Sequence, residues 1–342
     1  MNVLQIGSDS IHLRHFCKAM SAIAGDFILV TETPFLPEGV KMNIVTPFRG
    51  FNVFRWIQSY RKLKKAIVSI QPELIHIHQI NRLAWLVCRI AKQLKIPVIS
   101  TAWGSDVLLI PQQNKVYYSI TKSVLDYSSY VTADSQDMIS AMLAISNTHK
   151  KYIHLQYGID PTISSLQKQK IIYSNRLHKE LYRIDLIIDL FAQFFAQHSD
   201  WKLIIGATGH LTESLQKRAS ELLPQSAYEF IGWVDQETNA KHYSNAQIYV
   251  SLPLSDGTSV SLLEAMSANC IPVVSDLEVS REWITNQVNG IVYDLNANPF
   301  EQALKINSEK CFLINQEFIT KYALRETCMK KFENLYSNLI AS

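Results

Sequence analysis

Short apolar segments rich in β-branched residues alternate with longer amphipathic segments along most of the chain. Strands and helices in this rhythm form βαβ units around a parallel sheet. In the first half, the segments that we expect to be strands are Val3–Ile6, Phe27–Thr31, Asn43–Val45, Leu74–His78, Val98–Thr101 and Tyr130–Ala133. The same alternation resumes after a break, so the sequence predicts an α/β protein built from two Rossmann-like domains.

The break lies between Lys151 and Lys170, where Pro, Ser and mixed charges follow Tyr157-Gly158. We place the domain junction near Asp160, with domains over 1–160 and 161–320 and a terminal helix over 321–342 that packs toward the first domain. In the second half we expect strands at Ile171–Ser174, Leu203–Gly206, Tyr228–Ile231, Ile248–Ser251, Ile271–Ser275 and Gly290–Tyr293, and helical segments at Ile184–Gln197 and Gln316–Ile340. Ligands of open α/β sheets bind beyond the carboxyl ends of the strands, so two such domains facing each other predict a site in the cleft between them.

Composition excludes several other classes of protein. Hydrophobic residues make up 47% of the 342 residues and charged residues 18%, which rules out a disordered or low-complexity chain. The five cysteines are scattered and include no C-x-x-C pair, which argues against a disulfide framework and against a zinc knuckle. Neither a signal peptide nor a run of about eighteen apolar residues is present in the sequence, so a cytoplasmic protein is expected.

Charge is distributed unevenly between the two halves. Residues 1–160 carry 17 Lys and Arg against 10 Asp and Glu, whereas residues 161–342 carry 16 against 20. A basic first half indicates an anionic surface or substrate near that half, and ordinary solvation of a charged surface is the alternative.

The strongest chemical signal is the segment 251–276. A strand leads into Asp256-Gly257, Thr258 and Ser259 open a helix, and Glu264 lies on the second turn of that helix. The free amides and the positive dipole end of a helix N-terminus attract phosphate or sugar oxygens. Local capping is the alternative, with Ser261 and Glu264 forming a capping box and Asp256 an Asx turn.

This segment resembles the acidic signature of the family four retaining glycosyltransferases. In that family an acidic residue and a Glu eight positions later bracket the start of a helix, and A-M-x-x-x-x-P-V-V follows, as it does from Ala265 to Val274. The resemblance implies that Glu264 binds the ribose hydroxyls of a nucleotide sugar and that Asp256, where the family usually has Glu, contacts the hexose. It also implies that the stretch between the two carboxylates holds the phosphate and sugar oxygens. The donor-binding residues of that stretch are Gly257, Thr258, Ser259 and Val260.

Other landmarks of the second half match the same family in order. Arg176, in Ser174-Asn175-Arg176-Leu177, matches the arginine of a cationic clamp on the diphosphate. The usual lysine position falls near Leu181 or Tyr182, which leaves Lys179 or Arg183 as the second cation. Gly206, which opens Gly206-Ala207-Thr208-Gly209, resembles the first residue of a G-x-G turn at the donor, and Phe230-Ile231-Gly232 resembles an F-x-G turn.

The first half contains the landmarks that the family places beside the acceptor, together with a glycine loop, here at Gly7, that the family also places beside the donor phosphate. Gly7 ends the first strand and His12 follows it, while PELIHIHQ places His78 at the carboxyl end of a strand and His76 in the core. TAWGSDV resembles a T-x-H-G-x-D loop in which Trp103 replaces the histidine and Asp106 is retained. The resemblance implies a catalytic role for His78 and an acceptor-side role for His12, Trp103 and Asp106. Trp103 as a core residue is the alternative.

Residues 49–71 form a basic helical segment with aromatic residues between the cations. Such a face can bind anionic lipid headgroups while its aromatic rings enter the membrane interface. A solvated helix that covers the sheet is the alternative. Nucleic acid is disfavoured as a partner, because the domain lacks concentrated positive charge.

Together these features predict a GT-B glycosyltransferase that moves a hexose from a nucleotide diphosphate sugar, with UDP as the default, to a hydroxyl of a saccharide or lipid-linked saccharide. Retention is implied by the family. Bacterial-type surface polysaccharide or glycolipid assembly at the inner face of the cytoplasmic membrane is the expected setting. The sequence has no D-x-D motif, so no metal or other cofactor is expected. Two alternatives stay open: an epimerase or hydrolase on the same scaffold, and a non-catalytic homologue that binds a nucleotide sugar or stabilises a partner transferase.

Overall fold

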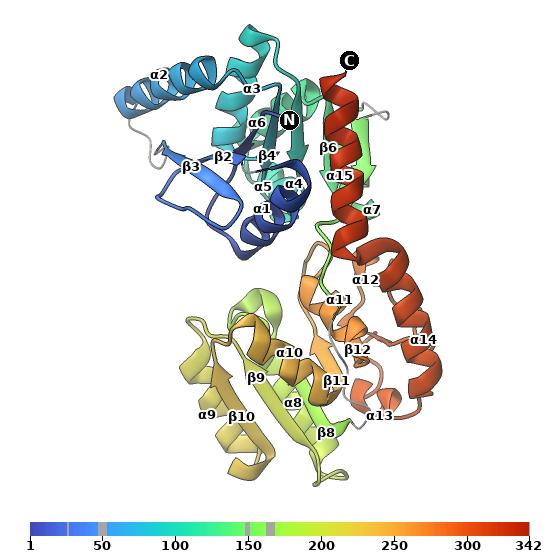
Figure 1. Ribbon diagram of the computed structural model, residues 1–342. Helices are drawn as coiled ribbons and strands as arrows, with labels where there is room; N and C mark the ends of the chain where they lie inside the picture. The colour runs from blue at the N-terminus through green and yellow to red at the C-terminus, as the bar shows by residue number, and fades with distance from the viewer. Residues whose placement is uncertain (26, 47–52, 148–150, 162–167, 342) are drawn as a thin grey trace. The chain divides into compact units, whose positions relative to one another are not determined.

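The computed structural model describes residues 1–25, 27–46, 53–147, 151–161 and 168–341 (Figure 1). The chain divides into two compact units. The first comprises Met1–Gly158 together with Arg325–Ser342, and the second comprises Ile159–Leu324. The terminal helix therefore belongs to the first unit and begins at Arg325 rather than at residue 321.

The first unit contains a seven-stranded sheet in the order β3-β2-β1-β4-β5-β6-β7, and all of its described strand pairs are parallel. Its strands are β1 (Val3–Ile6), β2 (Phe27–Thr31), β3 (Val40–Val45), β4 (Leu74–His78), β5 (Val98–Thr101), β6 (Tyr130–Ala133) and β7 (Tyr152–His154). Its helices are α1 (Ile11–Ala24), α2 (Val53–Ile70), α3 (Arg82–Leu94), α4 (Ser105–Leu108), α5 (Ile110–Gln113), α6 (Lys115–Tyr127), α7 (Gln136–Ile145) and α15 (Arg325–Ile340).

Helices cover both faces of this sheet, which explains why its central strands are buried at every position and not at alternate ones. Side chains of α1 and α15, including Phe16 and Phe332, form the core of one face. Side chains of α2, α3, α6 and α7, including Leu63 and Val87, form the core of the other. In Figure 1 the first strands are blue and α15, from the far end of the chain, is red.

The second unit has a six-stranded parallel sheet in the order β10-β9-β8-β11-β12-β13. Its strands are β8 (Gln169–Ser174), β9 (Lys202–Gly206), β10 (Tyr228–Gly232), β11 (Ala246–Ser251), β12 (Ile271–Ser275) and β13 (Ile291–Tyr293). Its helices are α8 (Ile184–Phe195), α9 (Thr212–Leu222), α10 (Gln236–Asn245), α11 (Val260–Ser267), α12 (Glu278–Arg281), α13 (Pro299–Ala303) and α14 (Ser308–Phe318), with short turns η2 (Glu180–Tyr182), η3 (Gln225–Ala227) and the π-helical η4 (Ile319–Ala323).

Two details of the expected secondary structure were wrong. The segment before Tyr157 contains a strand, β7, that the sequence did not reveal, because it is three residues long and only partly buried. The helical pattern from Gln316 to Ile340 is not one helix. It is interrupted at Leu324, whose extended backbone (ψ 129°) separates η4 from α15.

A buried chain of polar side chains crosses the sheet of the first unit. The Nδ1 and Nε2 atoms of His76 lie 2.6 Å from the Tyr336 hydroxyl and 2.8 Å from the Thr101 hydroxyl. His78 lies beside it, with Nε2 donating to Gln5 Oε1 over 2.7 Å and Nδ1 accepting from the Tyr157 hydroxyl. Burial lowers the pKa of His78 to about 3, so the ring is neutral in the folded protein. The network therefore joins α15 to the first sheet without any charge.

Acid should weaken the first unit through His78. Because the folded pKa lies below the unfolded value of 6.5, the unfolded chain takes up the proton first and stability falls as the pH drops from about 6.5 toward 3. We expect each pH unit in this window to cost up to about 1.4 kcal/mol through this residue. Urea unfolding of the wild type and of His78→Gln between pH 7 and pH 4.5 measures how the free energy of unfolding of each protein changes with pH. Parallel pH curves for the two proteins would contradict the assignment.

Candidate active site

The loop after β11 and the helix α11 form the centre of the candidate site. Ser259 is the N-cap residue of α11, and its Oγ accepts a hydrogen bond from the Leu262 amide. Helix capping is therefore performed by Ser259 and not by the alternative box of Ser261 with Glu264. The first amides of a helix have no carbonyl one turn before them, and here Ser259 takes the Leu262 amide. The amides of Val260 and Ser261 are therefore the ones at this N-terminus that can receive an anion.

Arg176 reaches this N-terminus from the end of β8. Its Nη2 lies 2.6 Å from Asp256 Oδ2, and its Nη1 donates to Ser259 Oγ. The ring of Tyr182 covers the guanidinium, with its centroid 4.4 Å from Cζ. Burial raises the pKa of Asp256 and Arg176 opposes that rise. The structure thus brings together Arg176 and Ser259, which are expected at the donor phosphate, and Asp256, which is expected at the hexose.

The two candidates for the second cation lie in different surroundings. Arg183 is half-buried and its Nε donates to the Leu252 carbonyl over 2.7 Å, so it braces the start of the loop that carries Asp256. Its backbone is left-handed (φ 47°) at the N-cap of α8. Lys179 is exposed just before the turn η2. Within the described residues, neither Lys179 nor Arg183 forms a side-chain hydrogen bond to Asp256.

Glu264 lies on the wall of a cavity of about 360 Å³ in the second unit. The other residues around it are Asp160, Pro161, Gln236, Glu237, Ala240, Lys241, Tyr243 and Ser244. Behind it, the hydroxyls of the buried tyrosines 173, 243 and 249 bond to Asn175 and Asn239. Glu264 is half-buried, and its charge contributes to raising the pKa of Tyr243 well above 10, after burial, which is the larger cause. The half-buried carboxylate therefore borders a space of ligand size, with a wall that hydrogen bonds fix in place.

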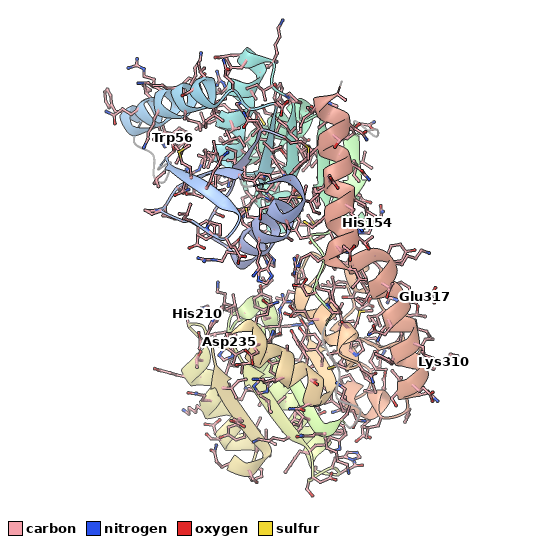
Figure 2. All side chains as sticks on the ribbon, viewed as in Figure 1. Trp56, His154, His210, Asp235, Lys310 and Glu317 are labelled. Carbon is pink, nitrogen blue, oxygen red and sulfur yellow. The ribbon has the colours of Figure 1, made fainter. Side chains whose placement is uncertain are left out.

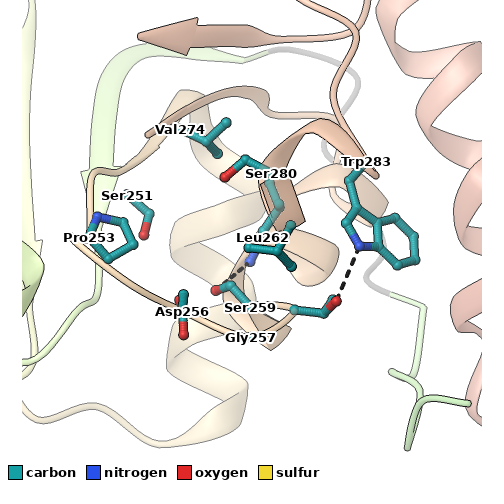
Figure 3. A pocket seen from close by; sticks show the side chains of 11 residues that line it. Ser251, Pro253, Asp256, Gly257, Ser259, Leu262, Val274, Ser280 and Trp283 are labelled. Atoms are coloured by element: carbon teal, nitrogen blue, oxygen red, sulfur yellow. Dashed lines mark hydrogen bonds between the residues drawn. The ribbon is translucent and has the colours of Figure 1, made fainter. Parts of the chain in front are cut away.

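A second, smaller pocket lies against the same loop (Figure 3). Its lining includes Ser251, Gly257, Thr258, Ser280 and Trp283. The indole Nε1 of Trp283 donates to Thr258 Oγ1 over 3.3 Å, which fixes the loop before α11. The sequence analysis missed Trp283, because no pattern relates this residue to a loop 25 positions earlier in the chain.

Close backbone contacts explain two glycines near the carboxyl end of β9. A Cβ on Gly206 would lie 3.1 Å from the Tyr173 hydroxyl, and one on Gly209 would lie 2.2 Å from the His178 carbonyl oxygen. The turn after β9 also bonds to the turn after β10, because the Ala207 amide donates to the Gly232 carbonyl over 2.7 Å. These contacts give both glycines a structural reason within the unit, independent of any ligand.

Two of the expected site residues of the first unit belong to its interior. His78 is 1% exposed and both of its ring nitrogens are bonded within the unit, so this arrangement does not support the expected catalytic role, which stays a prediction. Asp106 is also fully buried, and its carboxylate accepts hydrogen bonds from the amides of Ile80 and Trp103. Burial raises the pKa of Asp106 to about 6, and these amides oppose the rise. Asp106 therefore shapes the loop after β5 and is not free to bind an acceptor.

Trp103 and His12 lie next to each other at the carboxyl edge of the first sheet. The two rings meet edge to face with centroids 5.9 Å apart, and Trp103 Nε1 donates to the Tyr157 hydroxyl over 3.4 Å. His12 is exposed and Trp103 is half-buried, so Trp103 is not a core residue. Gly7 ends β1, where a Cβ would lie 2.6 Å from Leu13 Cδ2 and 3.4 Å from His78 Cβ.

Within the described ranges, no group of three or more His, Cys, Asp or Glu side chains is arranged to hold a metal ion. Among the same residues, no helix has the length and apolarity needed to cross a membrane. All five cysteines lie in the described part of the chain, where they are buried and form no disulfide.

Comparison with known families decides the class of protein. The model of the group 1 glycosyl transferases matches residues 160–310, and that of the glycosyl transferase 4-like domain matches residues 3–135. The chain belongs to the group 1 glycosyltransferases. It is therefore an enzyme of a retaining hexosyltransferase family, as the resemblance of its acidic segment predicted.

Similar proteins match most of the length of this glycosyltransferase. It is 22% identical to an uncharacterised glycosyltransferase of Methanocaldococcus jannaschii, over 85% of this chain and 82% of the relative. Its structure resembles HepE of Anabaena in complex with UDP and glucose (TM-score 0.79, 11% identity, 99% and 100% of the two chains covered). It also resembles the lipopolysaccharide outer core galactosyltransferase WaaB (0.74, 15%, 99% and 100%) and the sucrose-phosphate synthase of Thermosynechococcus elongatus (0.76, 14%, 100% and 100%). These similarities confirm the GT-B fold.

The close approach of Gly209 to the His178 backbone gives a test of the turn after β9. Gly209→Ala should force the backbone to move and cost about 1–3 kcal/mol, because the added Cβ meets a carbonyl oxygen and not a flexible side chain. Gly232→Ala is the matched control, since its Cβ meets no atom within 4 Å and only its left-handed φ of 67° is strained. Urea unfolding measures the free energy of unfolding of both variants and of the wild type. A Gly209→Ala protein as stable as the wild type would refute the close approach.

Proposed function

We propose that this glycosyltransferase transfers a hexose from a UDP-sugar to a hydroxyl of a saccharide or lipid-linked saccharide, with retention. The observation that carries the proposal is Glu264, a half-buried carboxylate that borders a cavity of about 360 Å³ on the helix whose N-terminus holds Arg176. A carboxylate can accept both ribose hydroxyls as charge-assisted hydrogen bonds. Support for UDP comes from HepE, whose structures hold UDP with glucose and UDP-glucose.

The diphosphate would lie at the amides of the first turn of α11 and at Arg176. Negative charge develops on the leaving nucleoside diphosphate as the glycosidic bond breaks, and fixed donors at that point lower the barrier. We assign Asp256 Oδ1 to the hexose, since Oδ2 is bound by Arg176. With retention, the leaving phosphate oxygen accepts the proton of the acceptor hydroxyl on the same face. The oriented hydrogen-bond donors that Arg176 and the helix N-terminus supply are the reason to expect turnover without a divalent metal.

The acceptor would bind at the first unit beside His12 and Trp103. An exposed imidazole next to a half-buried indole offers a flat apolar surface together with a polar edge, which suits a sugar ring. We place the enzyme in the cytoplasm, in the assembly of surface polysaccharide or glycolipid. The galactosyltransferase WaaB, which acts on the lipopolysaccharide outer core, has the same fold.

A lipid-linked acceptor agrees with the outer face of α2. Residues 49–52 of the basic segment lie outside the described residues, but the rest of the helix presents a mixed apolar and basic stripe. Its exposed members are Phe54, Ile57, Arg61, Lys65 and Val68, whereas Leu63 and Ile67 face the core. Trp56, marked in Figure 2, does not extend this stripe, because Arg82 lies over its ring at 5.7 Å. We propose that this stripe binds an anionic membrane surface.

Removing the Glu264 carboxylate should weaken UDP binding strongly. Glu264→Ala loses two charge-assisted hydrogen bonds, worth roughly 2–4 kcal/mol, or about thirty- to several hundredfold in affinity. Glu213→Ala, an exposed carboxylate on α9, is the control and should bind UDP as the wild type does. Calorimetric titration with EDTA and again with magnesium measures both. Equal UDP affinity for Glu264→Ala and wild type would remove Glu264 from the donor site, and loss of binding in EDTA would refute metal independence.

Reversing two charges of the α2 stripe should detach the enzyme from anionic vesicles. Each exposed cation near such a surface contributes about 1 kcal/mol, so Arg61→Glu with Lys65→Glu should lower binding about thirtyfold or more. Lys92→Glu with Lys115→Glu makes the same change of net charge elsewhere and is the matched control. Co-sedimentation with phosphatidylglycerol–phosphatidylcholine vesicles measures the difference. If both double variants lose the same amount of vesicle binding, only the net charge matters and the proposal that the α2 stripe binds the membrane is wrong.

A further inference from the structure

Arg176 is held from three directions by side chains of the second unit. Asp256 bonds to one terminal nitrogen over 2.6 Å and Ser259 Oγ accepts from the other. The ring of Tyr182 lies against the guanidinium with its centroid 4.4 Å from Cζ. The first two contacts hold the two terminal nitrogens of the guanidinium, and the third places an aromatic ring against its central carbon. The Arg176 side chain is only 11% exposed, so little solvent competes with these partners.

Tyr182 is set up for this contact by the local backbone. It ends the short turn η2, and the next residue, Arg183, has a left-handed backbone with φ 47° before α8 begins. The Tyr182 amide donates to the Lys179 carbonyl over 3.0 Å, which closes the turn. The side chain of Arg183 is bonded to the Leu252 carbonyl and braces a different part of the site. The turn thus places a tyrosine ring, and not a cation, beside Arg176.

The ion pair between Arg176 and Asp256 explains why the position of the Tyr182 ring matters. A guanidinium beside a carboxylate has no net charge, so long-range attraction for a diphosphate is weak at this point. A diphosphate gains instead from short, directional hydrogen bonds to a guanidinium that is already oriented, because little side-chain freedom is then lost on binding. A ring that fixes the guanidinium plane supplies that orientation.

We propose that Tyr182 is a positioning residue for the donor diphosphate, which acts by holding the guanidinium of Arg176 in the plane set by Asp256 and Ser259. The proposal rests on the proposed function, since it takes a nucleoside diphosphate as the ligand. In this role Tyr182 acts through Arg176 and not on the reacting atoms. It determines how well Arg176 binds the phosphate oxygens.

Titration with UDP and with uridine separates this role from a general one. Tyr182→Leu removes the ring and should weaken UDP binding about five- to thirtyfold, the range expected for a desolvated cation–π contact, with uridine binding unchanged within about twofold. Tyr182→Phe keeps the ring and loses only the hydroxyl, so its UDP affinity should lie closer to the wild type than that of Tyr182→Leu, with uridine bound as by the wild type. If Tyr182→Leu weakens UDP and uridine equally, or weakens neither, the proposal is wrong.

A double-mutant cycle with Arg176 supplies the second test. If Tyr182 acts through the guanidinium, Tyr182→Leu should change UDP affinity less than twofold once Arg176→Lys is present, because an ammonium has no plane to hold. An undiminished effect in the Arg176→Lys background would overturn the proposal. Wild-type enzyme that binds neither UDP nor uridine would instead refute the proposed function itself, so the two failures are distinguishable.

Discussion

Parallel pairing of the strands is the constraint on which the rest of this structure depends. A parallel pair needs a crossover of a dozen or more residues, so helices cover both faces of each sheet and the chain must alternate as it does. The same geometry gathers every carboxyl end at one edge. Arg176, Gly206 and Asp256, which follow β8, β9 and β11, are separated in sequence and share that edge of the second sheet.

Within that edge, the charge of Arg176 organises the donor side. A buried guanidinium is costly without partners, and Asp256, Ser259 and Tyr182 together provide them. The arrangement keeps a cation at the N-terminus of α11, where the helix dipole alone would repel it. An incoming diphosphate therefore meets an oriented donor set, and Glu264 on the next turn is the carboxylate to which we assign the ribose.

The sequence was sufficient for the fold class, for most strands and for the chemistry of segment 251–276, because periodicity and local capping are properties of neighbouring residues. It was not sufficient where distant parts of the chain meet. His78 ends a strand, as a site residue would, but Tyr157 and Gln5 bond to its ring and bury it. Trp283 bonds to Thr258, which is far from it in sequence, and no spacing relates the two residues.

The most direct test of the central claim is a crystal structure of this glycosyltransferase with UDP. The account predicts both ribose hydroxyls within hydrogen-bond distance of the Glu264 carboxylate, and phosphate oxygens at the first-turn amides of α11 and at the Arg176 guanidinium. UDP bound elsewhere on the second unit, or bound with its phosphates away from Arg176, would contradict it.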